Sequence, residues 1–152
     1  MTDFPLFVAT RRVEFRDTDA AGIAHFSRFF TLMEEAEHEL LRQLGMSVME
    51  HDAQGKISWP RVSAHCDFRG SVRFEDEIQI EVRIARVGDK SVTYAFRFLH
   101  DARPIAEGNL VAVCCRLLPG QPPVSIAIPA AMRARLEGYQ KSPAVQQESS
   151  GS

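Results

Sequence analysis

One amphipathic stretch, residues 27–44, restricts the fold more than any other feature of this chain. Its apolar residues recur at steps of three and four, which gathers them on one face of a helix: Phe29, Phe30, Met33, Ala36, Leu40, Leu41 and Leu44. Ser27 suits the N-cap, and Gly45 suits the left-handed residue that closes a helix. The sequence therefore predicts one helix of about five turns, from about Ser27 to Leu44.

Five other segments are typical of strands. Four of them alternate apolar and polar residues, as half-buried strands do, and the fifth is apolar on both faces, as expected of a central strand: residues 13–15, 61–69, 77–84, 91–99 and 105–118. Gly108 in the last segment predicts a bulge or the close approach of another element. The order is a strand, a long helix and then four strands in a meander, which is an α+β fold.

The length of 152 residues and a hydrophobic content of 45% fit one domain. We expect the domain to span residues 1–140, because residues 141–152 are polar and have the composition of a disordered tail. The three cysteines show no CxxC spacing, which favours buried thiols over disulfides or a zinc site.

Charge and hydropathy exclude several classes of protein. The formal net charge is -2 and no basic block is present, which argues against a nucleic-acid-binding protein. The N-terminus lacks the positive charge of a signal peptide, and no apolar run approaches the roughly 18 residues of a membrane span. These features predict a soluble, cytoplasmic protein without membrane insertion.

Two acids, Asp17 and Asp19, lie on the turn before the predicted helix. A carboxylate beside the free N–H groups of a helix N-terminus brings a base or nucleophile next to a group that can stabilise an oxyanion. That combination favours acyl chemistry. Of the two acids, Asp17 has more the character of a turn residue that hydrogen-bonds the backbone.

Two sequence motifs resemble those of proteins with the hot-dog fold, specifically the 4-hydroxybenzoyl-CoA thioesterase family. They are Asp17-Thr18-Asp19-Ala20-Ala21-Gly22-Ile23 before the helix and Gly88-Asp89-Lys90-Ser91 between two strands. The resemblance extends from about Val13 to Leu117. It implies one long central helix wrapped by a five-stranded antiparallel sheet. It also implies a homodimer or homotetramer with active sites at the subunit interface, and no metal or redox cofactor.

The resemblance implies an enzyme, an acyl-CoA thioesterase that releases a free acid and CoA. Asp19 falls on the family's carboxylate, which attacks the thioester carbonyl or activates water. Phe26 falls on the residue whose backbone N–H polarises that carbonyl. His25 is a candidate acid/base or substrate contact, although a capping role near the helix start fits it equally well. We expect four residues to contact the substrate, with the two cations binding CoA phosphates: Gly22, Lys90, Ser91 and Arg116.

Two other functions stay open. A hot-dog dehydratase needs a histidine and an acid facing each other across the dimer, and only His25 hints at such a pair. A non-catalytic subunit that binds acyl-CoA, or serves as a scaffold, would keep the fold without the reaction. The sequence leaves the acyl group open, because the depth of a pocket depends on packing.

Overall fold

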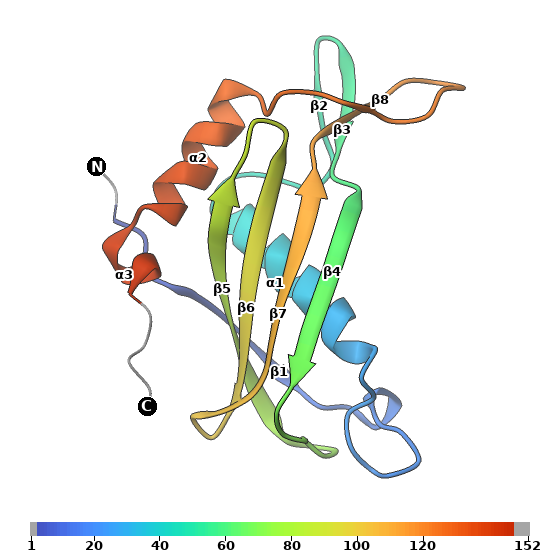
Figure 1. Ribbon diagram of the computed structural model, residues 1–152, viewed down its shortest axis with the longest axis vertical. Coiled ribbons are helices and arrows are strands. Elements are labelled where there is room, and N and C mark those ends of the chain that lie inside the picture. Colours follow the sequence, from blue (N-terminus) through green and yellow to red (C-terminus); the bar gives the residue numbers. More distant parts are fainter. Residues whose placement is uncertain (1–2, 148–152) are drawn as a thin grey trace.

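The computed structural model describes residues 3–147 and shows an antiparallel sheet of five strands with helix α1 across one face (Figure 1). The sheet order is β1-β5-β6-β7-β4. The bounds are β1 Phe7–Arg12, α1 Arg28–Gln43, β4 Arg61–Phe68, β5 Glu77–Val87, β6 Ser91–His100 and β7 Arg103–Val113. The α+β class and the antiparallel sheet are confirmed.

The strand order differs from the predicted meander. Strand β4 pairs with β7 rather than with β5, so that only β5, β6 and β7 form a meander and β1 pairs with the free side of β5. The alternation of residues correctly predicts that these segments are strands. It carries no information on pairing partners, because every half-buried strand has the same period of two.

Helix α1 packs closely on the sheet at Gly108 of β7. A Cβ atom at this position would lie 2.2 Å from Met33 Cε and 2.7 Å from the backbone oxygen of His65. The close approach predicted for Gly108 is therefore confirmed, since no larger residue fits between the helix and the strands. The predicted end of the helix is confirmed too, because Gly45 has a φ of +74°.

The first strand lies earlier than predicted. Residues 13–15 are not a strand: β1 ends at Arg12, and Phe15–Asp17 form a turn of 3-10 helix. The Phe15 side chain is 77% exposed, so the apparent alternation was not a core pattern. The physical reason is local, because the Asp17 carboxylate accepts a hydrogen bond from the Glu14 backbone N–H and closes the turn.

The C-terminal segment is more ordered than predicted. Helix α2, Ala130–Gln140, is followed by a short helix α3, Pro143–Gln146, in which Val145 is only 2% exposed. The Val145 carbonyl accepts a hydrogen bond from Arg83 Nε at 3.1 Å. The prediction of a disordered tail is therefore wrong up to residue 147, and its remainder, residues 148–152, lies outside the described residues.

A second, smaller sheet joins the segment between α1 and β4 to the segment after β7. Its order is β2-β3-β8-β9, with β2 Glu50–Asp52, β3 Gly55–Ser58, β8 Cys115–Leu117 and β9 Val124–Ser125. The predicted strand 105–118 is therefore two strands, β7 and β8, which meet at Cys114. All three cysteines are free. Cys114 and Cys115 are buried as predicted, whereas Cys66 is only partly buried. In the described part of the chain, no helix combines the length and apolarity needed to cross a membrane.

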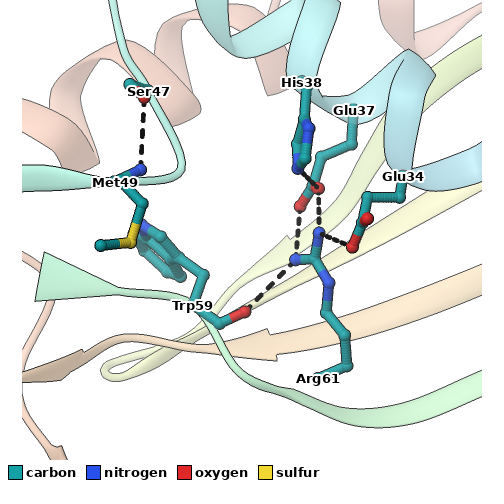
Figure 2. Close-up of polar contacts among 7 residues, drawn as sticks. All are labelled: Glu34, Glu37, His38, Ser47, Met49, Trp59 and Arg61. Atoms are coloured by element: carbon teal, nitrogen blue, oxygen red, sulfur yellow. Dashed lines mark hydrogen bonds and ion pairs between the residues drawn. The ribbon is translucent and has the colours of Figure 1, made fainter.

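A charged cluster lies between α1 and the start of β4 (Figure 2). The Glu37 side chain is 1% exposed and pairs with the Arg61 guanidinium, with 2.8 Å between Oε2 and Nη1. Arg61 also contacts Glu34 at 3.3 Å, and His38 Nε2 lies 3.6 Å from Glu37 Oε1. Burial raises the pKa of the Glu37 carboxyl, and the nearby Arg61 opposes this. The cluster fixes the first residue of β4 to the middle of the helix.

Candidate active site

The Asp17 side chain holds the turn together. It is buried, and its Oδ2 accepts the Glu14 N–H at 2.8 Å. Its Oδ1 lies 2.7 Å from Nε of Arg28, the first residue of α1. Both carboxylate oxygens therefore face protein groups, which fits the structural role predicted for Asp17.

The Asp19 carboxylate is held differently. Its Oδ1 accepts the Ala21 N–H at 2.8 Å and lies 3.5 Å from the Ile23 nitrogen. Oδ2 has no hydrogen bond or ion pair within the described residues. Gly22 closes this turn with a φ of +80°, a conformation that favours glycine. The backbone thus fixes the carboxylate through one oxygen and leaves the other available for chemistry.

The start of α1 presents an unpaired backbone donor. The Phe26 N–H makes no hydrogen bond within the described part of the chain, as expected for the first N–H groups of a helix. The helix begins next to Ser27 as predicted, but the Ser27 side chain makes no cap. Instead His25 Nδ1 accepts the Ser27 N–H at 3.2 Å, and its ring stacks on Phe26 with centroids 4.6 Å apart. The contacts of His25 therefore support a capping role at the start of the helix.

Asp19 and Phe26 line the same pocket, a cavity of about 220 Å³. Its other walls come from the turn, the helix start, the end of β4 and the loop after it: Ile23, Ala24, Phe29, Phe68, Gly70, Ser71 and Val72. Phe29 and Phe68 meet edge to face at 5.2 Å. The pocket is thus largely apolar and aromatic, and the residues that carry the free carboxylate oxygen and the unpaired N–H both line it. His25 is not among the lining residues.

The sequence analysis missed the contribution of the β4–β5 loop. Ser71 and Val72 reach the pocket because Ala24 N–H donates to the Val72 carbonyl at 2.8 Å, which joins the loop to the turn. Ile23 and Arg73 form an isolated antiparallel β-bridge, which also joins the loop to the turn. No local pattern marked these residues, since their neighbours in the pocket lie about 50 residues away in sequence.

The expected phosphate-binding residues lie elsewhere in this chain. Lys90 and Ser91 are at the β5–β6 hairpin and Arg116 is in β8, at the end of the sheet opposite to the turn (Figure 1). The Arg116 guanidinium binds the Asp52 carboxylate, with 2.9 Å between Nη2 and Oδ2, and this hydrogen bonding lowers the pKa of Asp52 to about 2. The fold of this chain therefore brings together Asp19, Gly22 and Phe26, and leaves Lys90, Ser91 and Arg116 apart from them.

This arrangement can carry out acyl transfer. A carboxylate oxygen without a protein partner can act as a base or nucleophile, and a free N–H at a helix start can stabilise a developing oxyanion. Within residues 3–147 no group of three or more His, Cys, Asp or Glu side chains is arranged to hold a metal ion.

The sequence matches the thioesterase-like superfamily over residues 13–136. A 1,4-dihydroxy-2-naphthoyl-CoA hydrolase of Synechococcus sp. (strain CC9605) is 29% identical over 115 residues, which cover 72% of this chain and 77% of the relative. A gentisyl-coenzyme A thioesterase of known structure is 31% identical, with a TM-score of 0.74, covering 85% of this chain and 98% of that one. A 1,4-dihydroxy-2-naphthoyl-CoA thioesterase from Synechocystis shares the fold, with a TM-score of 0.74 at 21% identity over 86% of this chain and 94% of that one.

Proposed function

The chain belongs to the thioesterase-like superfamily and hydrolyses acyl-CoA thioesters, and we propose that its acyl group is aromatic and that Asp19 carries the reaction. The turn motif from Asp17 to Ile23 supports a place beside the 4-hydroxybenzoyl-CoA thioesterases within this superfamily. The proposal is carried by the observation that Asp19, with an unpaired carboxylate oxygen, and Phe26, with an unpaired N–H, line one pocket.

These groups allow two mechanisms of thioester hydrolysis. Acting as a base, the Asp19 carboxylate takes a proton from water as the water attacks the thioester carbonyl. The Phe26 N–H stabilises the resulting oxyanion, and collapse of the intermediate expels the CoA thiolate, which takes the proton back from Asp19. Acting as a nucleophile, Asp19 displaces the CoA thiolate to form a mixed anhydride, which water then hydrolyses.

The shape and lining of the pocket support an aromatic acyl group. Three phenylalanines line it, Phe26, Phe29 and Phe68, and aromatic rings favour edge-to-face or offset contacts with one another. An apolar cavity of about 150 Å³ holds benzene. The volume of about 220 Å³ therefore accommodates a ring together with the thioester group. The relatives named for naphthoyl-CoA and gentisyl-CoA point to the same class of acid.

A CoA-release assay tests the activity and the acyl class together. We expect the protein to release CoA from benzoyl-CoA, gentisyl-CoA and 1,4-dihydroxy-2-naphthoyl-CoA with a kcat/KM at least about tenfold above that for decanoyl-CoA. A preference for decanoyl-CoA would contradict the aromatic assignment and leave the thioesterase intact. No CoA release from any of these thioesters would favour the non-catalytic subunit.

In a dimer, Lys90, Ser91 and Arg116 of one protomer could lie near Asp19 of the other. Strand β4 is an edge of the sheet, and the turn that carries Asp19 projects on that side of the molecule (Figure 1). If two β4 strands pair antiparallel about a two-fold axis, the β5–β6 hairpin of one protomer lies at the same end of the joined sheet as the Asp19 turn of the other. We therefore propose that the hot-dog sheet continues across a homodimer, alone or within a homotetramer, and that CoA phosphates bind across it.

Strand β4 exposes an apolar surface that suits this interface. Val62 is 63% exposed on it, and Phe68 at its end is 46% exposed. We predict a stable dimer or larger assembly at micromolar concentration by analytical ultracentrifugation, and we expect Val62→Lys to weaken it because burying a charged side chain in an apolar interface is unfavourable. Val8→Lys is the matched control, since Val8 is 43% exposed on the opposite edge strand β1. A monomeric wild-type protein, or equal effects of both variants, would contradict the β4 interface.

A further inference from the structure

Among the described residues that line the pocket, Ser71 and Asp19 have polar side chains, and the others are apolar or glycine. Asp19 is already assigned to the thioester. Any polar group that the acyl ring carries into the pocket therefore has Ser71 as its available partner among the described lining residues.

The backbone on both sides of Ser71 is fixed. The Arg69 and Gly70 N–H groups both donate to the Ile105 carbonyl of β7, at 2.8 and 3.0 Å. On the other side Val72 is 1% exposed, and its carbonyl accepts the Ala24 N–H. Ser71 is thus held between two anchored residues, and its hydroxyl needs only one side-chain rotation to orient.

The Ser71 hydroxyl has no partner among the described residues. No hydrogen bond to its Oγ or to its backbone N–H occurs within residues 3–147. A serine hydroxyl can donate one hydrogen bond and accept others, which suits a phenolic hydroxyl because that group also does both. A carboxylate substituent on the ring, in contrast, could only accept hydrogen bonds, and its negative charge would repel that of Asp19.

We infer that the Ser71 hydroxyl hydrogen-bonds a ring hydroxyl of the aromatic acyl group and so makes the enzyme prefer hydroxylated over unsubstituted rings. The inference rests on the proposed function and deepens it, because Ser71 is a specificity-determining residue and takes no part in breaking the thioester. Three phenylalanines contact the ring, and the Ser71 hydroxyl hydrogen-bonds the hydroxyl substituent of the ring.

The test compares benzoyl-CoA with 2-, 3- and 4-hydroxybenzoyl-CoA in the wild-type protein and in Ser71→Ala. We expect kcat/KM to fall about three- to tenfold for at least one hydroxybenzoyl isomer and less than about twofold for benzoyl-CoA, since one neutral hydrogen bond is lost. Ser71→Thr keeps the hydroxyl and should retain the preference. Melting temperatures should agree among the three proteins, because Ser71 is exposed.

The outcomes separate this inference from the proposed function. Equal losses with benzoyl-CoA and all hydroxybenzoyl isomers would place Ser71 against the CoA part of the substrate and overturn the inference. The same holds if the wild-type protein hydrolyses all four thioesters equally well, and in both cases the thioesterase stands. Failure of the wild-type protein to release CoA from any of the four would overturn the aromatic assignment and the inference with it.

Discussion

Replacing Asp19 with asparagine is expected to lower kcat by about 10²–10⁴-fold, with little change in KM. Asparagine keeps the shape of the side chain, and its oxygen can still accept the Ala21 N–H that orients Asp19 at 2.8 Å. It loses the charge of the free oxygen, which would act as base or nucleophile. Steady-state release of CoA from the best aromatic thioester measures the effect.

Asp17→Asn is the matched control, two residues away on the same turn. Its carboxylate faces the Glu14 N–H and Arg28, so the change should act on the free energy of unfolding, by about 1–2 kcal/mol, rather than on kcat. His25→Ala should likewise change stability more than kcat, because the ring caps the helix start. Equal and small effects on kcat at Asp17 and Asp19 would contradict the mechanism and favour a non-catalytic protein.

Arg61→Ala is expected to lower the free energy of unfolding by about 3–5 kcal/mol, because it leaves a buried carboxylate without its partner. Glu37 is 1% exposed, and Arg61 is the cation that pairs with both of its oxygens (Figure 2). Urea unfolding followed by circular dichroism measures the loss. Arg116→Ala is the matched control: it breaks the pair with Asp52, whose side chain is 42% exposed, and should lower the free energy of unfolding far less than Arg61→Ala does.

The loss in Arg61→Ala should depend on pH in a defined direction. Burial raises the pKa of Glu37, and without Arg61 nothing comparable opposes this. A carboxyl with a higher pKa in the folded than in the unfolded state favours folding when it is protonated, and this contribution disappears as pH rises through the folded-state pKa. The deficit should therefore be smaller at pH 5 than at pH 8. A deficit that is below about 1 kcal/mol and independent of pH would show that Glu37 is not an uncompensated buried charge.

Features that depend on residues close together in the chain could be predicted from the amino-acid sequence alone. The helical period of residues 29–41 predicted α1, Gly45 its end and Gly108 the close approach of the helix to the sheet. The turn that bears Asp19 was recognisable because Gly22 and the acids before it fix a backbone conformation over a few residues. Such features follow from side-chain chemistry within one or two turns of chain, so they can be predicted without knowing what packs against them.

Contacts between residues far apart in the chain became visible only in the folded protein. The pairing of β4 with β7 rather than β5, the burial of Glu37 against Arg61, the packing of Val145 and the entry of Ser71 into the pocket each join segments far apart in the sequence. Glu37 is a charged residue, a type that is seldom buried, and Val145 lies in a polar tail. Burial is a property of the partner surface as much as of the residue, and the free energy that selects one partner comes from the whole core.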